Sequence, residues 1–166
     1  VTVCAVRGNF DDAQTGVKQI FAACADRELP FLLSSANSIN IGRLAPQIMY
    51  YFKAYRDLLE RGEIRLGEEV NFSVPTGNFG DILAGYLARL LGLPVGKLIC
   101  ASNANNVLTD FIRTGTYDRR RPLYKTKSPS MDILVSSNLE RLLYLMSGDC
   151  DLVASLMQQL NENGVY

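Results

Sequence analysis

Histidine and tryptophan are both absent from this chain of 166 residues. Without an imidazole, the chain can neither use histidine as a general acid or base nor offer it to a metal ion. The four cysteines are far apart and show no Cys-x-x-Cys spacing, so no metal site and no disulfide framework is expected. They lie in apolar runs, which is typical of a reducing, cytoplasmic protein: Cys4, Cys24, Cys100 and Cys150.

The chain also lacks an excess of charge of either sign. Its 17 lysine and arginine residues are balanced by 17 aspartate and glutamate residues, so no overall field attracts nucleic acid or an anionic membrane. No stretch approaches the roughly 20 uninterrupted apolar residues that a membrane span requires. We therefore expect neither nucleic acid nor a membrane as a partner. The hydrophobic content of 48% is sufficient for a folded core.

Short apolar segments alternate with helical patterns along most of the chain. The segments at 1–6, 70–74 and 97–101 predict strands, and a helical pattern follows each of them. Such alternation is typical of parallel β-α-β units, whose ligands bind beyond the carboxyl ends of the strands. The sequence therefore predicts a three-layer α/β fold with a mostly parallel sheet and flanking helices. Helices are expected at 11–25, before Gly62, and at 79–91, 107–114, 138–146 and 149–160, with an irregular surface loop at 116–131.

The glycine-containing segment at 75–81 follows one of these strands and opens the expected helix at 79–91. Gly77 and Gly80 are expected to adopt positive φ and to let the backbone approach an anion closely. The first N–H groups of the helix would then point at the anion, with the helix dipole behind them. The residues alone leave two interpretations open: a phosphate-binding loop, or a turn that uses glycine for its geometry only.

A second group of polar residues follows a short apolar segment at 31–33. Asn37, Ser38 and Asn40 could contact a carboxylate or a second phosphate, but serine and asparagine are also common helix caps. Lys127 lies in the irregular loop, where it could either reach toward a phosphorylated ligand or face solvent. Both interpretations stay open for each of these residues.

Several separate segments, in order along the chain, resemble the threonine synthase family. The match includes residues 74–86, which contain the glycine loop, a Gly-Leu-Pro turn at 92–94, and an Ala-Ser-Asn-Ala-Asn segment at 101–105. Three further blocks look like parts of the same family: Gly-Asn-Phe-Asp-Asp-Ala-Gln at 8–14, Ser-Ser-Ala-Asn-Ser-Ile-Asn-Ile-Gly-Arg at 34–43 and Ser-Pro-Ser-Met-Asp-Ile at 128–133. Threonine synthases are pyridoxal-phosphate (PLP) enzymes of the tryptophan synthase β-like class.

The resemblance implies a partial copy of the tryptophan synthase β-like PLP fold and a role in amino-acid biosynthesis. The implied reaction is that of a lyase, which converts O-phospho-L-homoserine and water to L-threonine and phosphate. The PLP phosphate would be held chiefly by backbone N–H groups, with help from two side chains, at Thr76, Gly77, Asn78, Phe79 and Gly80. Asp81 would repel a phosphate dianion and is expected to face away from it. Substrate contacts are expected from Asn37, Ser38, Asn40 and Lys127.

Family members carry the lysine that forms the Schiff base with PLP in a Ser-x-Lys-Asp motif, and this sequence has no such motif. No catalytic residue is therefore expected here. We expect the chain by itself to make no threonine, and to bind PLP weakly and non-covalently if it binds PLP at all. Because it begins within an apolar run, the sequence is interpreted as an internal fragment. Residues 1–36 would be part of a smaller domain (strand-helix-strand), and residues 37–166 part of the larger, phosphate-binding domain.

Two other functions stay open at this point: another PLP-dependent lyase of the same fold, and a non-catalytic module that binds phosphate or a nucleotide. The blocks at 35–40 and 128–132 favour a threonine synthase over other PLP lyases, because PLP binding alone does not demand them. A fragment would also expose apolar surface, so self-association of the chain is a further expectation.

Overall fold

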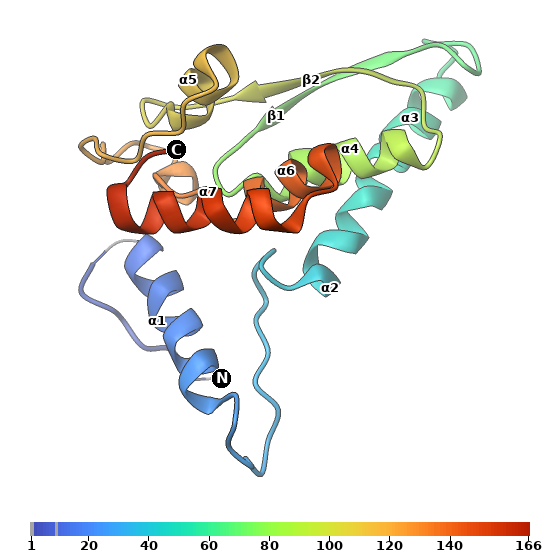
Figure 1. Ribbon diagram of the computed structural model, residues 1–166. Helices are drawn as coiled ribbons and strands as arrows, with labels where there is room; N and C mark the ends of the chain where they lie inside the picture. The colour runs from blue at the N-terminus through green and yellow to red at the C-terminus, as the bar shows by residue number, and fades with distance from the viewer. Residues whose placement is uncertain (1, 9) are drawn as a thin grey trace.

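The computed structural model describes residues 2–8 and 10–166, which form a mixed α/β structure (Figure 1). Strands and helices alternate in the middle of the chain, and helices precede and follow this part. In chain order the elements are α1 (Phe10–Cys24), α2 (Ile41–Leu44), η1 (Ala45–Gln47), α3 (Ile48–Glu60), β1 (Val70–Pro75), α4 (Gly80–Leu90), β2 (Val95–Ala101), α5 (Val107–Thr114), η2 (Pro129–Met131), α6 (Leu139–Ser147) and α7 (Cys150–Asn163).

The sheet consists of β1 and β2, which run parallel and are connected by α4. The paired residues run from Val70 and Val95 at one end to Pro75 and Ala101 at the other. In Figure 1, α4, α6 and α7 lie on the same side of the two strands. The predicted α/β class, with a parallel sheet and flanking helices, is confirmed. The segments that lead to α4 and to α5 leave from the same end of the sheet, since both strands end there.

The helix α4 begins directly after the glycine loop. Its first turn carries Asp81 and its last turn carries Arg89, and these charges complement the helix dipole. Gly92, with φ +96°, lies just beyond the end of the helix, as the sequence predicted. Gly85 lies inside the helix because a Cβ there would come within 2.6 Å of the Tyr51 ring on α3. This close approach allows α3 and α4 to pack directly against each other.

The predicted helical pattern before Gly62 is divided into α2, η1 and α3. Pro46 lies in η1, whose three residues form a 3₁₀ turn between the two α-helices. Proline has no N–H group and cannot continue the regular hydrogen bonding of an α-helix, which explains the division at this residue.

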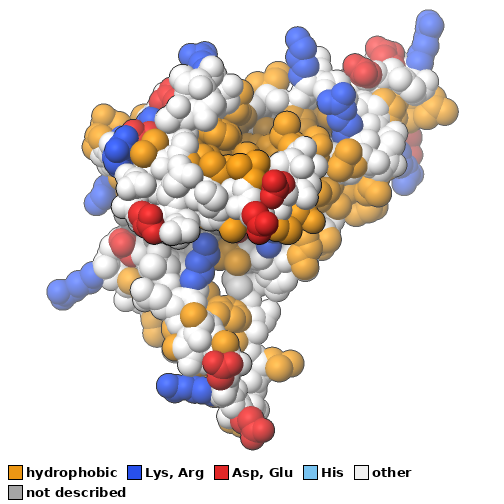
Figure 2. All heavy atoms as spheres, viewed as in Figure 1, with side chains coloured by type: hydrophobic (Ala, Val, Ile, Leu, Met, Phe, Trp, Pro, Cys, Tyr) orange, Lys and Arg blue, Asp and Glu red, His pale blue; other side chains and the backbone are white. Residues whose placement is uncertain are grey.

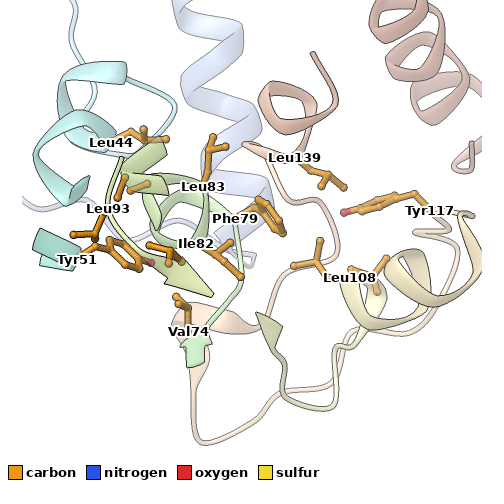
Figure 3. Packing of buried hydrophobic residues seen from close by; sticks show 14 of the residues in the cluster. Leu44, Tyr51, Val74, Phe79, Ile82, Leu83, Leu93, Leu108, Tyr117 and Leu139 are labelled. Atoms are coloured by element: carbon orange, nitrogen blue, oxygen red, sulfur yellow. The ribbon is translucent and has the colours of Figure 1, made fainter. Parts of the chain in front are cut away.

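Nearly all of the buried hydrophobic residues belong to one cluster around α4 (Figure 3). Leu83 on α4 and Leu44 on α2 are 1% and 0% exposed. Burial of one such leucine contributes about 1.5–3 kcal/mol to stability. The cluster extends toward α5 and α6 through Phe79, Leu108, Tyr117 and Leu139, which point toward one another in Figure 3. The helix that follows the glycine loop is therefore the central helix of the core.

The last residues of the chain return to the start of the irregular loop. Tyr117 and Tyr166 exchange backbone hydrogen bonds of 2.8 and 3.0 Å, and their stacked rings have centroids 5.2 Å apart. The Tyr117 hydroxyl donates to the Leu134 carbonyl at 2.8 Å and accepts the Ser136 N–H at 2.9 Å. Through these contacts the carboxyl-terminal residues and the buried Tyr117 ring fix the segment that leads into α6.

The strand predicted at 1–6 is wrong for residues 2–6, which are irregular and exposed, and Val1 lies outside the described residues. Val3 is 89% exposed. A strand needs a neighbour that takes up its backbone hydrogen bonds, and residues 2–8 and 10–166 provide no such neighbour for this segment. The apolar pattern was therefore insufficient to define a strand.

The rest of the amino-terminal region also differs in part from the prediction. The apolar segment at 31–33 is not a strand, and Leu32 is 98% exposed. The helix predicted at 11–25 is confirmed as α1, although Ile20, on its predicted core face, is 56% exposed. None of the helices within the described ranges is long and apolar enough to cross a membrane.

Candidate functional site

The residues 76–79 connect the carboxyl end of β1 to the amino end of α4, as the sequence predicted. The expectation that Gly77 and Gly80 adopt positive φ is wrong. Positive φ occurs instead at Phe79, which has φ 65° and ψ 10° and is the N-cap residue of α4. This conformation is uncommon for a large side chain and persists only where the surrounding structure holds it. The Phe79 ring is 6% exposed and lies in the core cluster, so its burial offsets the backbone strain.

Glycine is required at positions 77 and 80 because other segments of the chain lie too close to leave room for a Cβ. At Gly80 an added Cβ would lie 2.7 Å from the Ser38 Oγ and 2.8 Å from the Ser38 Cβ. At Gly77 it would lie 3.2 Å from the Ser130 carbonyl oxygen and 3.2 Å from the Met131 Cα. Two distant segments therefore enclose the loop, and side chains at these positions would push them away.

The loop offers backbone donors at the start of α4. The N–H groups of Gly77, Asn78 and Phe79 donate no hydrogen bond to any residue within 2–8 and 10–166. Thr76 differs, because its N–H donates to the Ala101 carbonyl at 2.8 Å and its hydroxyl donates to the Val74 carbonyl at 2.7 Å. Free N–H groups beside the positive end of a helix dipole form an anion site. The available donors therefore lie at residues 77–79.

A cluster of three polar residues, here called the asparagine cluster, holds the loop: the buried Ser38 and Asn138 and the half-buried Asn78. The Ser38 Oγ accepts hydrogen bonds of 2.9 Å from the side-chain amides of both asparagines. Asn138 is 0% exposed and also donates its N–H and its side-chain amide to the Asn78 carbonyl, at 3.0 and 3.1 Å. The Asn78 Oδ1 accepts the Gly80 N–H at 3.2 Å. The cluster thus joins three segments of the chain at the glycine loop.

The predicted substrate residues differ in their surroundings. Asn37 is half-buried beside the loop, and its Oδ1 accepts hydrogen bonds of 3.3 Å from Asn78 and Ser38. Asn40 caps α2, since its Oδ1 accepts the Gly42 N–H at 2.9 Å, which is the alternative role that the sequence left open. Lys127 is exposed, and within the described ranges its side chain has no hydrogen-bond or ion-pair partner. The structure therefore brings Asn37 and Ser38, but not Asn40, into contact with the loop.

The Asp81 carboxyl lies on the other side of the first turn of α4. It lines a cavity of about 210 Å³ together with Tyr51 and Phe72, and no residue of 76–80 lines this cavity. Burial raises the pKa of Asp81 above its usual value, an effect that the Tyr51 hydroxyl and the Arg43 charge partly oppose. Burial and the neighbouring Asp81 charge raise the pKa of Tyr51. This position agrees with the expectation that Asp81 faces away from a phosphate.

The irregular loop at 116–131 is attached to the end of β2 by a second polar network around Asp132. The Asp132 carboxylate accepts hydrogen bonds from the side chains of Asn103, Asn105 and Thr126 at 2.7, 3.1 and 2.7 Å, and from the Thr126 N–H at 2.7 Å. These donors, with the Thr126 N–H first, lower the pKa of Asp132. These bonds therefore fix the irregular loop near Ser130 and Met131, the two residues that lie close to Gly77.

The sequence did not identify three residues that support the glycine loop, namely Ser136, Asn138 and Arg141. Ser136 donates its hydroxyl to the Gly77 carbonyl at 2.6 Å, and Arg141 donates to the Ser38 carbonyl at 2.6 Å. Their partners lie about 60 to 100 residues away along the chain, so no local pattern reveals them. One signal was present: three consecutive polar residues at 136–138 interrupt an apolar run, and all three are buried.

Comparisons with known proteins give one consistent result. No family model matches the chain. The threonine synthase-like 1 protein of Macaca fascicularis is 52% identical over an alignment of 162 positions, which covers 93% of this chain and 22% of that protein. Threonine synthase of Pseudomonas aeruginosa is 46% identical over an alignment of 168 positions, which covers 96% of this chain and 33% of that enzyme. The crystal structure of PLP-bound threonine synthase from Brucella melitensis superposes with a TM-score of 0.79 at 44% identity, covering 98% of this chain and 34% of that one.

The fold is thus the α/β fold of the threonine synthase structures, over nearly the whole chain. With this level of identity to the relatives, the chain belongs to the threonine synthase family. It spans about a third of the length of the threonine synthases that it matches and about a fifth of the threonine synthase-like 1 protein.

Proposed function

We propose that this chain supplies the segment that anchors the PLP phosphate in a cytoplasmic threonine synthase, which converts O-phospho-L-homoserine and water to L-threonine and phosphate. The observation that carries the proposal is the set of free N–H groups at Gly77, Asn78 and Phe79, held at the start of α4 by the asparagine cluster. The name of the Brucella melitensis structure, a PLP-bound threonine synthase, supports the choice of ligand.

The donor set fits a phosphate dianion. Three backbone N–H groups and the positive end of α4 can stabilise its charge, and the Asp81 carboxylate lies elsewhere. We infer that Gly77, Asn78 and Phe79 bind the phosphate oxygens directly. Thr76 and Gly80 position the loop, because their N–H groups are already bonded within the protein. PLP, once bound, supplies the electron sink for the reaction.

Asn37 is the candidate for contact with the substrate. Its side-chain N–H₂ makes no hydrogen bond to any described residue, whereas its Oδ1 is occupied by Asn78 and Ser38. The half-buried amide therefore has donors left for a carboxylate or phosphate of O-phosphohomoserine. We propose for Lys127 a weaker role as an unpaired positive charge that attracts the phosphorylated substrate. Ser38 and Asn40 would act indirectly through their side chains: Ser38 supports the loop, and Asn40 caps α2.

We propose in addition that residues 1–36 belong to the smaller domain of the family fold and residues 37–166 to the larger one. In Figure 1, α1 lies below α7, and its apolar face is largely exposed, which supports a neighbour for this helix.

Figure 2 shows hydrophobic side chains gathered across the middle of one face. A groove of about 600 Å³ between α4, α6 and α7 has mainly apolar walls, so a second copy of the chain could associate there, which sedimentation at rising concentration tests.

By itself the 166-residue chain is expected to form no threonine. None of its lysines lies in a Ser-x-Lys-Asp motif, and Lys53, for example, pairs with Asp57 at 2.5 Å on the surface of α3. The test is to incubate the chain with PLP and O-phosphohomoserine and to measure threonine and phosphate, with Pseudomonas aeruginosa threonine synthase as the positive control. Borohydride reduction and peptide mass spectrometry then locate any covalent pyridoxyl group. Threonine formation, or complete modification of one defined lysine, would contradict the proposal.

A further inference from the structure

Arg141 is the arginine that contacts the asparagine cluster from α6. Its Nη1 donates to the Ser38 carbonyl at 2.6 Å and to the Asn138 Oδ1, and its Nη2 donates to the Ile39 carbonyl. One planar guanidinium therefore bonds to three acceptors on two segments that are about 100 residues apart. This geometry suits arginine, whose N–H groups form a rigid fork.

Among the residues that the structure describes, no partner neutralises the charge of Arg141. The side chain is half-buried, and no acidic residue within 2–8 and 10–166 forms an ion pair with it. All of its acceptors are neutral carbonyl or amide oxygens. A guanidinium without a counter-ion leaves a positive field near the loop, and this field favours an anion there.

The contacts of Arg141 reach the glycine loop in one step. Ser38 is held at its carbonyl by Arg141, and its Oγ accepts the side-chain amide of Asn78. The same Oγ lies 2.7 Å from the position of a Cβ at Gly80, so any shift of Ser38 moves the wall of the loop. Asn138, the second acceptor of Arg141, holds the Asn78 carbonyl.

We propose that Arg141 is a positioning residue for phosphate binding: its guanidinium fixes Ser38 and Asn138 against residues 77–80 and adds an uncompensated positive charge to the site. The inference rests on the proposed function, since it assigns Arg141 to the phosphate loop of that site. It predicts that the fork geometry matters as well as the charge, so lysine cannot replace arginine.

The test compares Arg141→Met and Arg141→Lys with Arg27→Met, a change at an exposed arginine that has no side-chain partner among the described residues. Hydrogen exchange is measured at the amides of Gly80 and Asn138, both bonded to Asn78, and at Thr76, which is bonded within the sheet. We expect exchange at Gly80 and Asn138 to become about tenfold faster in both Arg141 variants, since each loses charge-assisted hydrogen bonds. Thr76 should keep its protection, which shows that the fold persists.

Binding of PLP and of pyridoxal, which has no phosphate, gives the second measurement. Both Arg141 variants should weaken PLP binding at least about tenfold, Arg141→Met more than Arg141→Lys because lysine keeps the positive charge. Both should leave pyridoxal binding unchanged, because only the phosphate group contacts the loop. Arg27→Met should change neither. Unchanged exchange at Gly80 and Asn138, or full recovery of both properties by lysine, would overturn the inference. A wild-type chain that binds PLP and pyridoxal equally would overturn the proposed function instead, and the exchange data would still decide the role of Arg141.

Discussion

Replacement of Gly80 by alanine is expected to lower the free energy of unfolding by about 1–3 kcal/mol and to remove the preference of the chain for phosphate-containing ligands. The new Cβ would lie 2.7 Å from the Ser38 Oγ and 2.8 Å from its Cβ, so either Ser38 or the loop must move. Ser38 is 6% exposed and is bonded to both asparagines of the cluster, so it cannot move without breaking those bonds. The N–H groups at 77–79 would therefore lose their arrangement.

The matched control is Gly16→Ala. Gly16 lies inside α1, and a Cβ there would meet no atom within 4 Å. Alanine at an open helical position should stabilise the protein by about 0.5–1 kcal/mol. Urea unfolding of both variants measures the difference, and PLP titration measures the ligand preference. If Gly80→Ala has the same free energy of unfolding as Gly16→Ala and still prefers PLP to pyridoxal, the claim that Ser38 lies directly against Gly80 is wrong.

Replacement of Asn138 by alanine is expected to have the largest effect on stability, about 3 kcal/mol. The side chain is fully buried and bonds to Ser38, to the Asn78 carbonyl and to Arg141. Its removal takes one hydrogen bond from each of these groups, and such a bond contributes about 0.5–1.5 kcal/mol, or about 1.5–3 kcal/mol where a charged group takes part. The loss of volume adds a cavity beside the loop.

Asn161→Ala serves as the comparison for Asn138→Ala. Asn161 is exposed on α7, and its side chain has no hydrogen-bond partner among the described residues, so its removal should change the unfolding free energy by less than about 0.5 kcal/mol. Equilibrium unfolding in urea measures both variants under the same conditions. Equal stabilities of the two variants would show that the asparagine cluster does not hold the loop.

Local elements were predictable from the sequence because their signals are local. The helix predicted at 107–114 is found as α5 with the same limits, and Gly115 adopts φ +76° at its end. The strands at 70–74 and 97–101 and the helix between them also follow the prediction closely. In these segments the periodicity, the capping residues and the terminating glycine all indicate the same structure.

The errors concern contacts between distant segments. The strand predicted at 1–6 had the correct composition, but a strand also needs a neighbour, which the local sequence does not specify. The sequence predicts positive φ at Gly77 and Gly80, whereas the left-handed residue is Phe79. The actual cause of the two glycines is the approach of Ser38 and of Ser130 with Met131, at separations of about 40 and 50 residues, which no local pattern reveals.

The sequence predicts where the candidate site lies, but not the contacts that support it. The sequence located the loop and named Asn37, Ser38 and Asn78, which the structure brings together. It treated Asn138 as the start of a helix, which is also its local role before α6. Its contacts with Ser38, 100 residues away, depend on the fold as a whole.

The central claim is that residues 77–79 bind the phosphate group of PLP, and a comparison of PLP with pyridoxal tests it most directly. Both compounds are titrated into the isotopically labelled chain while the backbone amide signals of Gly77, Asn78 and Phe79 are followed by NMR. We predict weak, non-covalent binding in which PLP binds at least about tenfold more tightly than pyridoxal and shifts these three signals. Equal affinities, or shifts confined to lysines outside the loop, would contradict the claim.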